Sequence, residues 1–227
     1  MGDLESEERQ LLVTETSGTT KFFDIQSSRN GSITNEEPPR PSIKSVPSES
    51  DSPRFRELLK RSQSIDLKEI NHTGCIYQSG TDKSGRPVIV FIGKWFRTND
   101  VDLEKAILFL LKVVDPVSTG DYVVVYFHSK TSRDNIPSYG WIKDVYSTLS
   151  YRYKKNLKAF YIVHPTLWTK LTCWWFSTFM APAIKNKIIN IHALSELEPH
   201  LNTKELNLPM FITEHDMSLN GLRFYEP

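Results

Sequence analysis

The pattern of apolar and polar positions changes near residue 53. Before this point, apolar residues are sparse among Ser, Thr, Glu, Asn and Pro. A segment of this composition buries too little surface to offset the entropy lost on ordering, so residues 1–53 are predicted to be a disordered tail. We expect a short helical lead-in at 54–73, the folded domain at 74–217 and a C-terminal extension at 218–227.

Short apolar runs in the folded part predict the strands of a sheet. Residues 74–77 and 88–92 are expected to form a β-hairpin, because a turn sequence that ends at Gly85 lies between them. Continuous runs of β-branched and aromatic residues predict three further buried strands, at 122–127, 157–163 and 187–192.

Amphipathic stretches separate these strands. The clearest is 103–114, where apolar residues recur at helical spacing and Asn99 or Asp100 is the expected cap. After the last strand, residues 207–209 are expected to begin an extended exit to the C-terminus. Further helices are expected at 137–149, 166–180 and 194–201. Strands that alternate with helices predict an α/β fold, a mixed or parallel sheet with helices on both faces.

Residues 166–180 form the most unusual of the expected helices. Apolar side chains surround it almost completely, and three tryptophans fall within eight residues, 168–175. A helix that is apolar on most sides must be covered by protein, lipid or a ligand. It follows His164–Pro165 and ends near Pro182, so we expect it to move as a unit and to act as a cover over an apolar pocket.

Composition narrows the function classes. The chain has 28 basic and 27 acidic residues, a formal net charge of +1, so no overall field favours nucleic acid. Two cysteines provide neither a disulfide framework nor metal-finger spacing. The acidic N-terminus does not resemble a secretory signal, and no apolar run approaches the roughly 20 residues of a membrane span. We expect a cytoplasmic protein, peripheral at membranes, without cofactor or metal.

No motif indicates catalysis. His128 and Ser129 follow a predicted strand, where α/β proteins often place functional residues. However, the sequence has no G-x-S-x-G, H-E-x-x-H, P-loop or G-x-G-x-x-G pattern. His164, between a buried strand and Pro165, is interpreted as a structural residue that hydrogen-bonds a turn. The chain is therefore expected not to be an enzyme.

Several stretches together resemble the divergent CRAL-TRIO domain of the BCH type. They are 153–159, 161–166, 82–87, 121–128, 135–138 and 194–197. The resemblance spans residues 74–216. Such domains occur at the N-terminus of certain Rho GTPase-activating proteins and in the C-terminal half of a macro-domain protein. The resemblance implies a mixed sheet as floor, helices behind it, and a mobile gate helix over its open face. By position, residues 166–180 would be that gate.

The first function that this resemblance implies is a non-enzymatic scaffold or adaptor. It would bind Rho-family GTPases or their regulators in signalling, and self-association is a further expectation. The expected partner site is a group of basic side chains: Arg152, Lys154, Lys155 and Lys158. The alternative for these residues is a solvated helix end, whose lysines suit the dipole at a helix C-terminus.

The second function is a lipid-binding module that holds a phospholipid or another apolar ligand under the gate and contacts membranes peripherally. The expected ligand contacts lie on the gate and on the floor: Trp168, Leu171, Trp174, Trp175, Phe179, Val123, Val125 and Phe160. The alternative is a self-filled core without a cavity. The two functions are compatible with each other.

Overall fold

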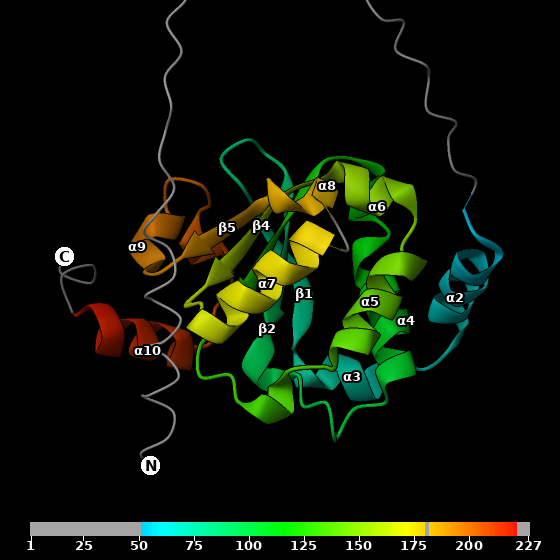
Figure 1. Cartoon of the computed structure of the whole chain (residues 1–227), viewed down its shortest axis with the longest axis horizontal. Helices are drawn as coiled ribbons and strands as arrows, with labels where there is room; N and C mark the ends of the chain where they lie inside the picture. The colour runs from blue at the N-terminus through cyan, green and yellow to red at the C-terminus, as the bar shows by residue number, and fades with distance from the viewer. Residues whose placement is uncertain (1–50, 180–181, 222–227) are drawn as a thin grey trace, which may run out of the picture. The chain divides into compact units, whose positions relative to one another are not determined.

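The computed structural model describes residues 51–179 and 182–221, which contain one five-stranded sheet with helices on both faces (Figure 1). The mixed α/β architecture predicted from the sequence is confirmed. The predicted disordered tail falls almost wholly outside the described residues, as does most of the expected C-terminal extension.

The strands follow one another across the sheet in chain order. They are β1 Ile76–Thr81, β2 Pro87–Ile92, β3 Tyr122–Phe127, β4 Leu157–Val163 and β5 Ile188–Ile191. Strands β1 and β2 form the predicted antiparallel hairpin, and β2 to β5 are parallel. In the hairpin turn, the buried carboxylate of Asp82 accepts hydrogen bonds from the backbone N–H of Ser84 and from the Arg86 side chain, at 2.9 and 2.6 Å.

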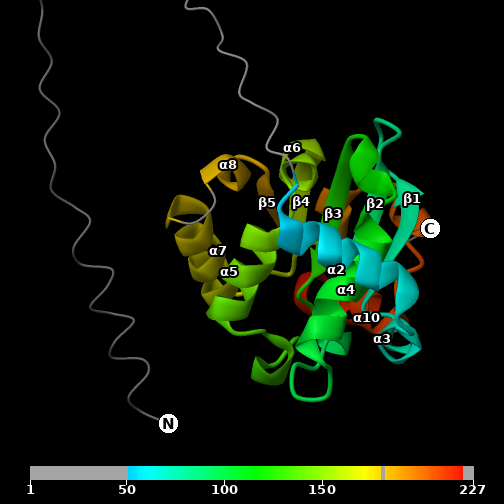
Figure 2. The same ribbon diagram turned by 90° about the vertical axis from the view of Figure 1, so that its right-hand side faces the viewer.

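This strand order decides which face each crossover helix covers. Parallel crossovers are right-handed, so crossovers that all step in one direction put their helices on one face. The helices on this face are α4 Leu103–Val114, α5 Tyr139–Thr148, α6 Tyr151–Asn156, α7 Leu167–Phe179 and α8 Pro182–Lys185. Helices α5 and α7 lie side by side over it (Figure 1 and Figure 2). The lead-in helices α2 Pro53–Ser64 and α3 Lys68–Thr73 join the same core through Phe55 and Ile70.

The opposite face is covered by the segment that follows β5. It contains α9 Leu194–Leu197, a short 3-10 turn at Thr203–Glu205 and α10 Met210–Asn220. Leu194, Leu197 and Ile212 of this segment pack against the sheet.

Two expectations about helix ends need correction. Helix α4 is capped by Asp102, whose carboxylate accepts from the N–H groups of Glu104 and Lys105, rather than by Asn99 or Asp100. The extended exit after residue 209 is instead α10, which begins after Pro209 and buries Ile212 and Asp216, one turn apart. The domain boundary expected after residue 217 therefore falls inside a helix.

Alternation along β3 and β4 separates two cores. Val123, Val125 and Phe127 point to the face covered by α9 and α10 and are fully buried. Tyr161 of β4 faces the same way, whereas Phe160 packs on the crossover-helix side. The register pairs Val125 with Tyr161, as the pleat requires.

The centre of β4 should not tolerate a charge. Ile162 is 1% exposed and is paired with the exposed Asn190 of β5. Ile162→Asp would bury an unpaired charge at a cost of several kcal/mol, comparable to a whole domain's stability of roughly 5–15 kcal/mol, so it should abolish folding. Asn190→Asp places the same charge at an exposed position. Its free energy of unfolding should lie within about 1 kcal/mol of the wild-type value. Cooperative thermal melting of soluble Ile162→Asp protein, followed by circular dichroism, would contradict this assignment.

Candidate apolar ligand site

A cavity of about 370 Å³ lies between the sheet and the crossover helices. Its floor includes Phe91, Val124 and Phe160, from three neighbouring strands, and one wall is formed by α5, with Trp141 and Val145. These floor residues are only partly buried, whereas their neighbours on the opposite face are fully buried. The sheet is thus tightly packed on one face and incompletely filled on the other.

Of the three floor residues expected from the sequence, only one lines this cavity. Phe160 lines it. Val123 and Val125 lie on the opposite face, in the core under α9 and α10, and the floor is made by Val124 and the neighbouring tyrosines, Tyr122 and Tyr126. The correction follows from the period of two along a strand, because a shift of one residue moves a side chain to the other face.

Helix α7 contributes two threonines to the described lining of the cavity. Thr169 and Thr172, one turn apart, line the cavity. Leu171 and Trp174, which the sequence assigned to the ligand, are 55% and 53% exposed and point away from the sheet. At 3.6 residues per turn these two pairs must occupy opposite sides of the helix. The side chains of Trp168, Trp175 and Phe179 lie outside the described part of the chain.

A chain of polar side chains marks one end of the cavity. The Tyr126 hydroxyl lies 3.1 Å from Nδ1 of His128, and the Thr169 hydroxyl lies 2.9 Å from Nε2 of the same ring. Thr169 continues to the hydroxyl of Thr166, at 2.8 Å. Burial lowers the pKa of His128 below its ordinary value and raises that of Tyr126 to about 12, so both groups are neutral at pH 7. This chain joins the sheet to the start of α7.

Three other polar side chains of the lining are bonded to the protein itself. The Tyr122 hydroxyl donates to the carbonyl of Tyr153 at 2.9 Å, and the Trp141 indole N–H donates to the carbonyl of Leu103 at 3.3 Å. The Tyr153 hydroxyl donates to the Asp115 carboxylate at 2.8 Å. Tyr126 and Thr169 are the lining residues that hydrogen-bond His128.

A second buried polar chain joins Ser129, His164 and Asp216 and was not predicted. The Ser129 hydroxyl is 2.7 Å from Nδ1 of His164, and Nε2 of His164 is 2.8 Å from the Asp216 carboxylate. Asp216 also accepts from the backbone N–H of Leu194 and from the Asn220 side chain. The sequence placed His164 in a structural role but not Asp216, which is 52 residues away. The only sequence signal for Asp216 was its position one turn after the apolar Ile212, on what became the buried face of α10.

The Ser129–His164–Asp216 chain resembles a hydrolase triad in composition but not in geometry. In the triad, serine contacts Nε2 and aspartate Nδ1 of the imidazole, whereas here the two are exchanged. Ser129 is 0% exposed and does not line the cavity. His164 has a positive φ of 54°, a strained conformation that these two hydrogen bonds hold in place. The chain fastens the ends of β3 and β4 to α10.

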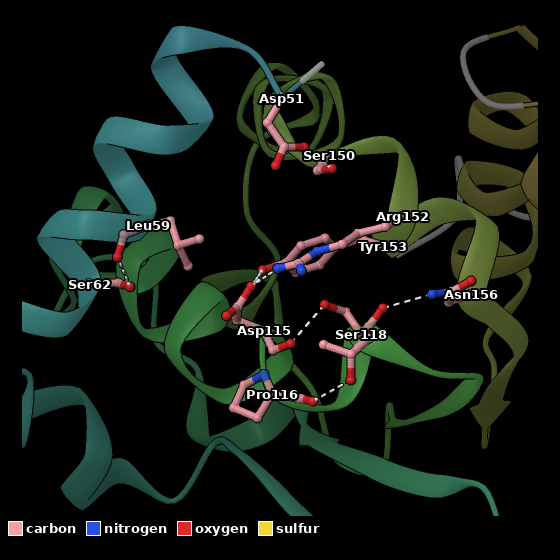
Figure 3. A network of polar contacts seen from close by, with 11 residues as sticks. Asp51, Leu59, Ser62, Asp115, Pro116, Ser118, Ser150, Arg152, Tyr153 and Asn156 are labelled. Atoms are coloured by element: carbon pink, nitrogen blue, oxygen red, sulfur yellow. Dashed lines mark hydrogen bonds and ion pairs between the residues drawn. The ribbon is translucent and has the colours of Figure 1, made fainter. Parts of the chain in front are cut away.

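The basic residues expected to form a partner site have different environments. Figure 3 shows Arg152 directed at the Asp115 carboxylate, with which it forms an ion pair. Lys158 pairs with Asp121 at 3.1 Å, and the Lys154 ammonium lies 4.5 Å from the centre of the Tyr146 ring. Lys155 is exposed at the end of α6. Arg152 is thus tied to Asp115 although its side chain is 37% exposed, and Lys155 is an exposed charge of this group for which no ion pair is seen among the described residues.

Residues 51–179 and 182–221 contain neither a cluster of metal-binding side chains nor a membrane-spanning helix. No three His, Cys, Asp or Glu side chains in these ranges are placed to bind one metal ion. The helices there are too short or too polar to cross a bilayer.

Comparison with known proteins identifies a shared domain. Residues 85–218 match the divergent CRAL/TRIO domain. A GDAP2 homologue of Drosophila melanogaster is 55% identical over 174 residues, 77% of this chain and 32% of the relative. The ganglioside-induced differentiation-associated protein 2 of Xenopus tropicalis is 35% identical over 74% of this chain and 34% of its own. The chain thus spans about a third of the length of these relatives.

A solved structure supports the same fold. The crystal structure of Sfh5 matches with a TM-score of 0.52 and 12% sequence identity, over 63% of this chain and 56% of that one. The overlap agrees with the fold that the sequence predicted.

The buried His128 should make stability depend on pH. Its pKa lies below the ordinary 6.5, so below about pH 6.5 the unfolded chain binds a proton that the folded chain resists, and the free energy of unfolding falls. His215 is shifted in the same direction and contributes as well. His128→Gln keeps a neutral hydrogen-bonding group and should flatten the fall in the free energy of unfolding below about pH 6.5, measured by urea unfolding. His72→Gln, at an exposed site, is the control. If the free energy of unfolding of His128→Gln falls with pH as steeply as that of the wild type, His128 is not the source of the pH dependence.

Proposed function

The chain belongs to the divergent CRAL/TRIO domain family, and on this basis we propose that it is a non-enzymatic module that binds an apolar ligand between its sheet and α7. The cavity of about 370 Å³ under α7 carries this proposal. Most of its lining is aliphatic or aromatic, so water inside it would find few hydrogen-bonding partners. An apolar ligand gains roughly 25 cal/mol for each Å² that it removes from water.

The outer face of α7 supports a route for such a ligand. Leu167, Leu171 and Trp174 follow at i, i+4 and i+7 and are 75%, 55% and 53% exposed. Tryptophan is favoured at the interface between lipid and water. We propose that this stripe touches a bilayer while the ligand enters. Equal co-sedimentation of the wild type and of Trp174→Ser with phosphatidylcholine vesicles would contradict this contact.

A second proposal is the adaptor role towards a Rho-type GTPase. The exposed Lys155 at the end of α6 favours it, because an acidic partner can reach this charge without breaking an ion pair seen in the structure. Lys155→Glu should leave the melting temperature nearly unchanged and should weaken binding of a GTPase at low salt, measured by calorimetry. Arg152→Ala is the contrasting variant, since it should lower stability through loss of the Asp115 pair. Binding that is unchanged in Lys155→Glu would remove this proposal.

The cavity can be tested with two neighbouring valines. Val124 faces the cavity, and Val123 faces the filled core. Val124→Phe should keep the wild-type melting temperature, because the ring enters open space, and should abolish binding of the apolar fluorophore N-phenylnaphthylamine. Val123→Phe adds the same atoms to a filled core and should lose about 1–3 kcal/mol of stability.

The outcome that contradicts the proposed function is equally direct. If Val124→Phe binds the fluorophore like the wild type, the ligand does not occupy this cavity. If the two variants lose the same stability, the face under α7 is as full as the opposite one. Lys155→Gln, an exposed change, serves as the control for fluorophore binding.

A further inference from the structure

We propose that the ligand is a neutral lipid with a single alkyl chain, and that its hydrogen-bonding head lies against the hydroxyl groups of Thr169 and Thr172 on α7. This inference rests on the proposed function and names the chemical class of the ligand. It follows from the charge, the polar geometry and the size of the cavity.

The lining of the cavity carries no charged side chain. Among the described residues that line it there is no Asp, Glu, Lys or Arg. His128 is buried, and its lowered pKa keeps it neutral. A phosphate or carboxylate group placed here would be an unpaired charge in an apolar site, which is strongly unfavourable. The head group inside the cavity must therefore be uncharged.

The hydroxyl groups provide the hydrogen-bonding capacity that such a head needs. A hydroxyl has one donor and two acceptor positions. The Thr169 oxygen has two side-chain neighbours, His128 at 2.9 Å and Thr166 at 2.8 Å, which leaves one position open. Thr172 also lines the cavity, one turn further along α7, and its side chain carries a second hydroxyl. An alcohol or amide head can bond to this pair while its chain extends over Phe160 and Val124.

The volume favours one alkyl chain. Pockets for small molecules range over roughly 300–1,000 Å³, so a cavity of about 370 Å³ is near the lower limit. A phospholipid with two chains exceeds this space unless α7 is displaced. The hydrogen bond between Thr169 and His128 holds α7 against the sheet. The space under α7 thus matches a slender ligand.

The test compares probes with the same alkyl chain and different heads. Each probe competes with N-phenylnaphthylamine for the full chain, and its affinity is read from the displacement of the fluorophore. The probes are decane delivered from cyclodextrin, decanol, and decanoate at about pH 8, where a carboxyl group is ionised. One hydrogen bond contributes enough to make decanol roughly two- to tenfold tighter than decane. Decanoate should bind more weakly than decanol. Thr169→Val or Thr172→Val, which keep the side-chain shape, should reduce the preference for decanol over decane towards unity.

The controls separate this inference from the proposed function. Thr178→Val makes the same change on α7 at a hydroxyl that does not line the cavity, so it should keep the wild-type preference. Decane binding by each variant reports whether the cavity has survived, and Thr172→Val stands in if Thr169→Val fails to fold. Equal affinity for the three probes, or tightest binding of decanoate, would overturn the neutral-ligand inference and leave the proposed function intact. Absence of fluorophore binding by the wild type would overturn both.

Discussion

The order of the strands is the constraint on which the rest of this structure depends. Because β2 to β5 are parallel and adjacent in chain order, right-handed crossovers place α4, α5, α6 and α7 on a single face. The opposite face would remain open without the segment after β5. Helices α9 and α10 supply that cover, and Asp216 locks α10 to the turn after β4 through His164.

The two faces differ in how completely they are filled. The face under α9 and α10 is a dense core with Val123 and Val125 at its centre. The face under α5 and α7 retains a cavity, and the described side chains of α7 that line it are Thr169 and Thr172. Threonine side chains are short and polar, so they leave both space and hydrogen-bonding capacity. The same orientation of α7 exposes Leu171 and Trp174 to the outside. An incompletely filled floor and an apolar outer stripe are thus two consequences of one helix orientation.

The strands and the class of fold were predictable because their signals are local. A run such as Tyr122–Phe127 has the length and composition of a buried strand whatever surrounds it. Which strand residues form the floor was not predictable in this way. Val123, Val124 and Val125 are three consecutive valines, and only the pairing with neighbouring strands decides which of them faces α7. The orientation of α7 has the same origin, because a helix that is apolar on most sides has no preferred inner face.

Long-range polar contacts were equally hidden. Ser129, His164 and Asp216 come from three distant parts of the chain, and no spacing rule joins them. The basic residues of α6 illustrate the reverse case. Arg152 looks like a free surface charge in the sequence, but it forms an ion pair with Asp115, the residue that ends α4. Charge clusters in a sequence therefore mark candidates, and only the fold separates unpaired charges from those held in ion pairs.

The central claim, that the space under α7 holds an apolar molecule, is tested most directly by native mass spectrometry of the intact chain after incubation with excess decanol. The account predicts an ion heavier than the chain by one decanol molecule, and no such ion from the Val124→Phe variant. An ion at the mass of the chain alone in the wild type, or the same adduct in both proteins, would contradict it.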